Sequence, residues 1–151
     1  MRRPLFLAAF LFAVTAFASA QTPASSIEKA QRLFERYVRL ETAFDPSVAD
    51  LYADEALIKN KRVYPIGPPR ELTMPAPKYK ELVRQSMPLA KKRGDRSTYG
   101  SVTYTPEGSN IRITAVRFSE LKKYSSPISL LVGASKTGAW LILEELSESR
   151  P

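Results

Sequence analysis

The stretch FERYVRLETAFDPSVADLYADEALI, residues 34–58, sets the order of the first structural elements. Residues 34–43 carry apolar side chains at helical spacing. Asp45 and Pro46 then interrupt the pattern, because aspartate is typical of a helix cap and proline of a first helical position. From Ala56 onward the pattern is that of an extended strand. The stretch therefore predicts a helix, a second short helix and a strand in close succession.

The first helix is predicted to start upstream, at residue 25, with the segment SSIEKAQRLFERYVRLETAF. Ser25 and Glu28 have the spacing of a capping box, which satisfies two backbone N–H groups at a helix start. One face of this helix should be buried and the other solvated. The side chains predicted to face the core are Ile27, Ala30, Leu33, Phe34, Tyr37 and Val38.

Proline dominates the next region, IGPPRELTMPAP, residues 66–77. We expect a loop there, with at most one short edge strand near residues 71–73. A third helix is predicted over residues 77–94, PKYKELVRQSMPLAKKRG, with a left-handed glycine cap at its end. Pro88 should kink this helix or end it near Met87, because proline lacks the amide hydrogen that a helix interior needs.

The rest of the sequence alternates between strand and turn signals. Four strands are predicted: TYGSVTYT, NIRITAVRFSE, PISLLVGA and AWLILEELS. In the second, Ile111 and Ile113 fall on one face but Val116 and Phe118 on the other, which predicts a bulge or strong bend. Helices followed by strands indicate an α+β domain, in which about three helices pack on a strongly curved, mainly antiparallel sheet.

Residues 1–20, MRRPLFLAAFLFAVTAFASA, combine an arginine pair, an apolar stretch and a small-residue end. This composition is typical of a secretory signal peptide, and we expect cleavage after Ala20. An uncleaved anchor helix is the alternative. Cleavage would leave a single domain, residues 21–151, without a second apolar stretch long enough to cross a bilayer. The sequence therefore predicts a secreted or periplasmic protein.

The composition excludes several kinds of chemistry. The chain has no cysteine and no histidine, which excludes disulfides, thiolate metal sites, serine–histidine catalysis and zinc-activated water. We expect no metal site and no cofactor. There are 23 basic residues against 15 acidic ones, and loss of Arg2 and Arg3 with the signal would leave 21 against 15.

This basic excess suggests one further reading. Lys78, Lys80 and Arg84, together with residues 91–93, could form a cationic face that adheres to anionic components of a cell envelope. Nucleic acid is not an expected partner, because export would separate the protein from it. The tyrosines also do not alternate with the basic residues as they would in a stacking platform.

The order of elements resembles that of the nuclear transport factor 2-like superfamily, which includes ketosteroid isomerase and the SnoaL-like polyketide cyclases. The resemblance lies in residues 34–58, the proline-broken hairpin, the following helix and the ending VTYTPEGSNIRITAVRF…PISLLVGASKTGAWLILEE. It implies a cone-shaped domain in which helices close a bent sheet over a pocket. It also implies a homodimer formed through the sheet, as in many such domains.

Ketosteroid isomerase uses an aspartate base and an oxyanion hole made of a tyrosine and a protonated aspartate. Aligned with this family, the tyrosine falls on Tyr37, the base on Asn60 and the second aspartate near Leu130. An amide cannot accept a proton at neutral pH, and neither Ser129 nor Leu131 replaces the missing acid. The resemblance therefore implies a non-catalytic domain that binds a small apolar ligand or a protein partner.

Aromatic side chains with a polar group are the candidates for lining the pocket, because a tyrosine combines an apolar ring with a hydroxyl that needs a partner. Asn60 could orient a ligand through hydrogen bonds or face solvent on an edge strand, and Tyr37 could simply pack in the core. The predicted ligand-binding residues are Tyr37, Tyr52, Asn60, Tyr64 and Tyr104.

The alternative function is an isomerase, dehydratase or cyclase acting on a small hydrophobic substrate. Tyr37 would then donate a hydrogen bond, and Asp54 or Glu144 would be the base. Glu144 and Glu145 follow an apolar strand, so alternation sends one of them to each face. Asp54 and Glu55 also fit a polar turn between helix and strand.

Overall fold

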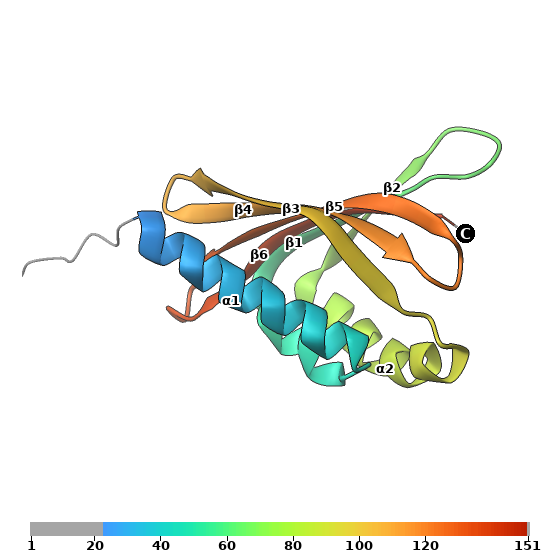
Figure 1. Cartoon of the computed structure of the whole chain (residues 1–151), viewed down its shortest axis with the longest axis horizontal. Coiled ribbons are helices and arrows are strands. Elements are labelled where there is room, and N and C mark those ends of the chain that lie inside the picture. Colours follow the sequence, from blue (N-terminus) through green and yellow to red (C-terminus); the bar gives the residue numbers. More distant parts are fainter. Residues whose placement is uncertain (1–22, 151) are drawn as a thin grey trace, which may run out of the picture.

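The computed structural model describes residues 23–150, so the predicted signal peptide lies outside the described residues. The elements follow the chain as α1 (Pro23–Thr42), η1 (Pro46–Leu51), β1 (Tyr52–Arg62), β2 (Arg70–Pro75), α2 (Ala76–Arg93), β3 (Ser97–Glu107), β4 (Asn110–Ser119), β5 (Tyr124–Ala134) and β6 (Trp140–Ser149) (Figure 1). The strand order is β2-β1-β6-β5-β4-β3. Neighbouring strands pair antiparallel, except that β1 and β6 pair parallel.

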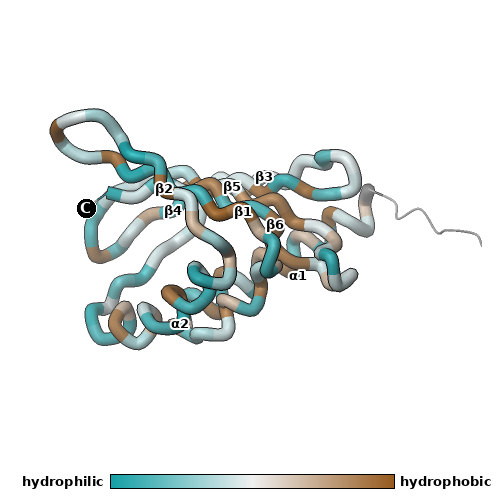
Figure 2. The backbone as a smooth tube through the Cα atoms, turned by 180° about the vertical axis from the view of Figure 1, so that it is seen from behind, coloured by the Kyte–Doolittle hydropathy of each residue, from teal (hydrophilic) through white to brown (hydrophobic). Residues whose placement is uncertain are grey.

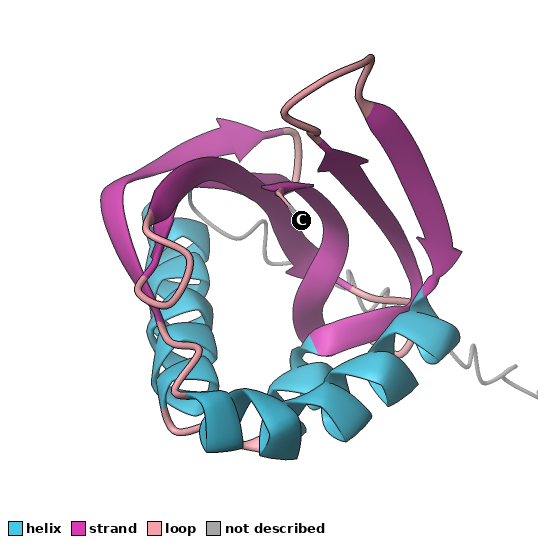
Figure 3. Ribbon diagram, turned by 90° about the vertical axis from the view of Figure 1, so that its right-hand side faces the viewer, coloured by secondary structure: helices cyan, strands magenta, loops and turns pink. Residues whose placement is uncertain are grey.

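The helices cover one face of the sheet, which we call the inner face. α1 and α2 meet at an angle, and the strongly bent sheet closes over them (Figure 3). The predicted α+β class, with helices packed on a curved and mainly antiparallel sheet, is therefore confirmed. Between residues 23 and 150, no helix combines the length and the apolar character that crossing a membrane requires. The strand residues at the centre of the core are Ile111, Ile113, Ile128, Leu130, Val132 and Ile142.

α1 begins at Pro23, upstream of the predicted cap at Ser25. Ser25 therefore lies inside the first helical turn, and the predicted capping-box start is wrong. The earlier start has a physical reason, because the fixed backbone angle of proline suits the first helical position. The predicted inner face of this helix is confirmed by the burial of Ala30, Leu33, Phe34 and Tyr37.

η1 forms where the Asp45-Pro46 pair predicts a second short helix. The Asp45 side chain accepts a hydrogen bond from the Ser47 amide at 2.8 Å, and this bond lowers the pKa of the Asp45 carboxyl group. Val48 and Leu51 turn inward and are buried. The cap thus fixes the point at which the chain leaves α1 and enters the sheet.

β1 starts at Tyr52, directly after η1, so the predicted turn at Asp54 and Glu55 is wrong. Both acidic residues lie inside the strand and point to solvent. The pairing of β1 with β6 is irregular between Tyr52 and Leu57. This irregularity allows the acidic pair to sit at the surface while Tyr52 and Ile58 are both buried.

β2 is the edge strand expected near residues 71–73, and α2 follows it directly. α2 continues through Pro88 to Arg93, so the prediction that it ends near Met87 is wrong. Packing compensates for the hydrogen bond that proline cannot make. The α2 side chains that pack against the core are Tyr79, Val83 and Met87. Gly94 then ends the helix in the predicted left-handed conformation.

β4 keeps a single alternation along its length, so the predicted bulge in this strand is wrong. Ala115 is buried and Arg117 continues the same face, whereas Val116 is 41% exposed on the opposite, outer face. The irregularity lies in the partner strand β3, where the register shifts between Gly100 and Thr103. As a result, a cation and not an apolar side chain enters the space under the sheet.

Candidate functional site

An inner cavity of about 400 Å³ lies between the helices and the inner face of the sheet. Apolar side chains, mostly from α2, form part of its wall: Val48, Leu82, Val83 and Met87. The remaining wall is polar and combines hydroxyl groups with both signs of charge. Its residues are Tyr37, Glu41, Tyr52, Tyr79 and Arg117.

A buried carboxyl group lies behind this wall. Glu145 on β6 is only 3% exposed. The Tyr52 hydroxyl donates a short hydrogen bond to Glu145 Oε2, and the Tyr79 hydroxyl lies 3.2 Å from Oε2 and 3.3 Å from Oε1. The two tyrosine rings meet edge to face with centroids 5.3 Å apart. Burying a carboxyl group without hydrogen-bond donors costs free energy. The hydroxyl groups of Tyr52 and Tyr79 offset this cost.

Burial raises the pKa of the cavity tyrosines Tyr37, Tyr52 and Tyr79, and the proximity of Glu145 raises each of them further. These hydroxyls therefore stay protonated and act as hydrogen-bond donors at physiological pH. Tyr37 is held by ring contacts: it stacks on Phe34 and meets Tyr99 edge to face, with centroids 5.9 Å apart in both cases.

Arg117 brings a positive charge to the cavity wall from β4. In the sheet register it lies between Tyr99 on β3 and Ser126 on β5. Its Nη2 donates a hydrogen bond to the Glu148 carbonyl oxygen at 3.0 Å. Burial lowers the pKa of Arg117, but Tyr37, Tyr99 and other acidic groups nearby outweigh burial, so the net shift is upward. The guanidinium group therefore remains charged.

Glu41, in the last turn of α1, supplies the acidic counterpart. Burial raises its pKa, and the neighbouring Tyr99, Ser97 and Arg117 offset only part of that increase. Glu41 Oε2 and Tyr99 Oη are both buried, and neither makes a hydrogen bond within residues 23–150. Unpaired buried polar atoms cost free energy, so this end of the core carries a local cost.

A smaller cavity of about 210 Å³, which we call the mouth cavity, adjoins the inner cavity. The two cavities share Glu41, Met87 and Arg117. Lys122 and Arg150 also line the mouth, so its wall carries an excess of basic groups over acidic ones. In the described part of the chain, no three carboxylate, histidine or cysteine side chains gather closely enough to hold a metal ion.

The predicted ligand-binding residues separate in space. Tyr37 and Tyr52 line the inner cavity. Asn60 lies further along β1 and is half-buried. Its amide nitrogen donates to Ser147 Oγ at 3.0 Å, and its amide oxygen accepts from Ser149 Oγ at 2.7 Å. The side chain at the family's base position is thus occupied in linking β1 to β6.

Tyr64 and Tyr104 do not reach the inner cavity. Tyr64 lies at the base of the β1–β2 loop, with the Arg62 guanidinium 5.9 Å from its ring centroid. Tyr104 packs edge to face against Phe34 at 6.5 Å, on the flank of α1. The predicted placement of these two tyrosines is wrong for two reasons: Tyr64 follows the end of β1 in the loop, and the Tyr104 ring is taken up by its contact with α1.

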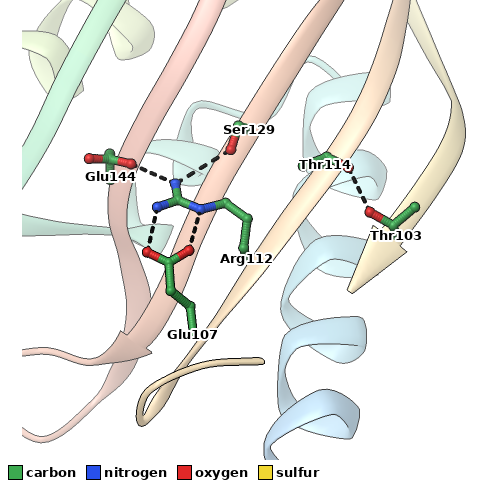
Figure 4. A network of polar contacts seen from close by, with 6 residues as sticks. All are labelled: Thr103, Glu107, Arg112, Thr114, Ser129 and Glu144. Atoms are coloured by element: carbon green, nitrogen blue, oxygen red, sulfur yellow. Dashed lines mark hydrogen bonds and ion pairs between the residues drawn. The ribbon is translucent and has the colours of Figure 1, made fainter. Parts of the chain in front are cut away.

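Neither predicted base enters the cavity. Glu144 lies on the outer face, where Arg112 Nη1 approaches its Oε1 to 2.5 Å within a polar network (Figure 4). Asp54 is exposed and pairs with Lys80 at 2.7 Å. The expected alternation does send one member of the Glu144–Glu145 pair inward, but that member is Glu145.

Two polar groups of the cavity were missed from the sequence, although each left a signal. Glu41 follows Tyr37 by one helical turn and therefore shares its face of α1. Arg117 follows Ala115 in strict alternation and therefore shares its face of β4. Both signals were hidden by the expectation that charged side chains face solvent.

Comparisons with known proteins identify the fold. No protein-family model matches the chain, and no relative is found among curated proteins. A nuclear transport factor 2-like protein of unknown function from Pseudomonas putida has a similar structure, with a TM-score of 0.64 and 11% identity over 85% of this chain and 89% of that chain. The chain therefore has the nuclear transport factor 2-like fold predicted from its element order.

Two further solved structures have a similar fold. A candidate dehydratase of the nuclear transport factor 2-like family from Streptomyces avermitilis has a TM-score of 0.55 and 13% identity over 84% of this chain and 97% of that chain. A Catenulispora acidiphila protein solved in complex with S-DNPA has a TM-score of 0.53 and 13% identity over 83% of this chain and 93% of that chain. At such identities the likeness shows the fold alone.

The first prediction tests the tyrosine–carboxyl contact. Tyr52→Phe leaves Glu145 buried without its shorter hydrogen bond and should lower the free energy of unfolding by about 1.5–3 kcal/mol. Tyr79→Phe removes a longer contact and should cost about 1 kcal/mol. Urea unfolding measures both, with Tyr104→Phe as the control. Equal losses for all three variants would contradict the assigned role of Glu145.

The second prediction concerns pH. Because burial raises the pKa of Glu41, its stabilising contribution is present at low pH and is lost as the pH rises through the folded-state value. Glu41→Gln should therefore gain stability over the wild type as the pH increases from about 4 to about 8. Urea unfolding across this range is the measurement, and exposed Glu35→Gln is the control. A gain that does not change with pH would count against a buried Glu41.

Proposed function

We propose that this protein is an exported, non-catalytic binding protein that holds a small, largely apolar ligand in its inner cavity. The observation that supports this most is the cavity wall, where apolar side chains of α2 face a set of protonated tyrosines. A pocket with an apolar body and a few convergent polar groups is the usual form of a small-molecule site. Its volume of about 400 Å³ falls within the range of such sites.

The two polar ends of the site favour binding over catalysis. Glu145 is 3% exposed, does not line the inner cavity and is enclosed by the hydroxyls of Tyr52 and Tyr79, so it does not meet a molecule bound there. Glu41 and Arg117, by contrast, both line the inner cavity. A ligand with a hydroxyl or amide group could bond to these side chains while its apolar part lies against α2.

Export forms part of the proposal and rests on the composition of residues 1–20. α1 starts at Pro23, so cleavage after Ala20 would remove no described helix or strand. Intact mass of the protein recovered from a periplasmic or culture fraction should correspond to a chain that begins at Gln21. A mass that includes residues 1–20 would argue against a cleaved signal.

Homodimer formation through the sheet also forms part of the proposal. The outer face leaves Leu57, Val116 and Leu146 between 39% and 41% exposed, and a groove of about 570 Å³ crosses it from Glu71 to Ser101. The groove carries both basic and acidic side chains, so a second copy related by two-fold symmetry could match it in charge. Sedimentation analysis distinguishes such a dimer from a monomer.

The third prediction tests the cavity with the dye 8-anilinonaphthalene-1-sulfonate, whose apolar rings and sulfonate suit α2 and Arg117. Val83→Trp should fill the cavity and weaken dye binding at least about tenfold, because the displaced rings lose their buried apolar contact. Fluorescence titration gives the dissociation constants. The control is Leu89→Trp, since Leu89 lies on the same helix but is 56% exposed. Unchanged binding by Val83→Trp would place the dye elsewhere.

A second candidate function is proton transfer on a small hydrophobic substrate, as in an isomerase, dehydratase or cyclase. One observation favours it: Glu41 is a cavity carboxyl group whose pKa is raised, and it lies near the protonated Tyr37. A base with a pKa closer to neutral is better suited to such chemistry. The candidate base is therefore Glu41 and not Asp54 or Glu144, both of which face away from the cavity.

The fourth prediction separates the two functions. If Glu41 is a base, the wild type should accelerate exchange of the α-protons of a cyclic ketone with deuterated water, and Glu41→Gln should slow it by about 10²–10⁴-fold. Nuclear magnetic resonance follows the exchange. Glu35→Gln is the matched control on the exposed side of α1. No exchange above the solvent rate in the wild type would leave binding as the function.

A further inference from the structure

The loop between β1 and β2 protrudes from the body of the protein. Residues 63–69, VYPIGPP, form this hairpin loop and contain no charged side chain. It projects at the same end as the C-terminus, and its tip is apolar (Figures 1 and 2). Ile66 is 92% exposed, which is the largest exposure of any large apolar side chain within residues 23–150. Such a residue at the tip of a projecting loop indicates a contact surface.

The backbone of the hairpin loop is restricted. Pro65, Pro68 and Pro69 fix their own backbone angles, and Gly67 takes a positive φ of 95° that the turn requires. A loop with so few conformations loses little entropy when it binds. The exposed tip is therefore presented in one shape, ready for contact.

Two arginines face each other at the base of the loop. Arg62 on β1 and Arg70 on β2 are register partners. Like charges directly opposite each other in a sheet are unfavourable. Within residues 23–150 neither arginine forms an ion pair, and the guanidinium of Arg62 lies over the Tyr64 ring. The pair would be stabilised by an anionic partner that approaches the loop.

More basic groups lie beside the same loop. A depression of about 380 Å³ is lined by Val63, Tyr64 and Pro65 from the loop and by Lys122, Tyr124 and Arg150 from the opposite side. The last three residues also line the mouth cavity. The hairpin loop, with Arg62 and Arg70 at its base, therefore lies next to Lys122 and Arg150, which also line the mouth cavity. We call the loop and these four basic residues the loop surface.

We propose that this surface docks on a bilayer that contains anionic lipids. Ile66 and the adjacent prolines enter the edge of the hydrocarbon region, and Tyr64 lies at the headgroup level that tyrosine prefers. Arg62, Arg70, Lys122 and Arg150 contact lipid phosphates. Each basic residue at an anionic surface strengthens binding about fivefold. Together with one inserted apolar tip, this is sufficient for reversible binding.

A bilayer fits the surface better than a folded protein partner does. A stable protein interface buries about 800 Å² on each side and needs shape complementarity. The hairpin loop offers a single narrow tip, and the depression beside it is lined by only six residues, whereas such an interface uses about 20–30 on each side. A bilayer demands no matching shape, because lipids rearrange around an inserted side chain. Docking would also place the mouth of the cone against the membrane, where apolar ligands partition.

The experiment uses the chain from residue 21 to 151, which contains every described element and lacks the apolar leader. Vesicle sedimentation compares pure phosphatidylcholine with vesicles that contain about one third phosphatidylglycerol. We expect at least about tenfold stronger binding to the anionic vesicles at low salt, and loss of most of this difference at high salt. Equal binding to both vesicle types, or no binding to either, would overturn the proposal.

Variants separate the tip from the charges. Ile66→Ser should weaken binding about tenfold through the loss of apolar insertion, and Arg70→Gln should weaken it about fivefold through the loss of one phosphate contact. The controls are Leu89→Ser and Arg36→Gln, which change exposed residues on α2 and α1. Anionic-vesicle binding that Ile66→Ser leaves unchanged would overturn insertion of the loop.

Fluorescence reports the insertion directly. The chain has one tryptophan, Trp140, so Trp140→Phe combined with Tyr64→Trp places a single reporter at the base of the loop. Its emission should shift to shorter wavelength with anionic vesicles and remain unchanged with neutral ones. Trp140→Phe combined with Leu89→Trp is the control and should not shift. A shift of the control alone would show that another surface meets the membrane.

Discussion

The hydrogen bonds that Tyr52 and Tyr79 donate to Glu145 are the interaction on which the inner structure depends. They join three segments that are far apart in the sequence: the start of β1, α2 and β6. A carboxyl group with 3% exposure is tolerated only where donors surround it. α2 must therefore hold Tyr79 at a fixed distance from the sheet, and that spacing leaves the inner cavity open beside the contact.

The same constraint gives the cavity its chemical character. Tyr52 and Tyr79 donate hydrogen bonds to Glu145 through their hydroxyl groups, and their rings form part of the cavity wall. Burial keeps these hydroxyl groups protonated. Arg117 and Glu41 complete the wall nearer the mouth. The site thus changes from mainly apolar beside α2 to charged where the inner cavity adjoins the mouth cavity. This gradient would orient a ligand with its apolar part inward and its polar group at the mouth.

On the outer surface, acidic side chains form ion pairs with basic ones. Glu144, the neighbour of Glu145, points to the outer face and is paired with Arg112, while Asp54 is paired with Lys80 across to α2. Both acidic groups are therefore already engaged in ion pairs with nearby basic side chains. Arg62 and Arg70, at the base of the hairpin loop, have no such ion pair within residues 23–150. Lys122 and Arg150 line both the depression beside the loop and the mouth cavity.

Local chemistry in the sequence was sufficient to predict much of the fold. The Asp45-Pro46 cap, the amphipathic face of α1, the edge strand before α2 and the glycine end of α2 depend on neighbouring residues and on periodicity. The errors arose where a local signal did not decide the structure. α2 passes Pro88 although the side chains that anchor it to the core, Tyr79, Val83 and Met87, all precede the proline. β4 keeps its alternation because the bulge falls in its partner strand.

The candidate site was less accessible from the sequence than the fold. Periodicity placed Tyr37 inside and showed that Glu144 and Glu145 face opposite ways. The resemblance to the nuclear transport factor 2-like superfamily, and not periodicity, implied that Asn60 stands at the position of the catalytic base. Periodicity could not show which glutamate faces inward, nor that Arg117 and Glu41 meet under the sheet. Those outcomes depend on strand register and on contacts between distant segments. The sequence by itself determined the elements and their faces, because these follow from short-range spacing. Only the tertiary structure decided which polar groups share the cavity, because register and long-range packing bring them together.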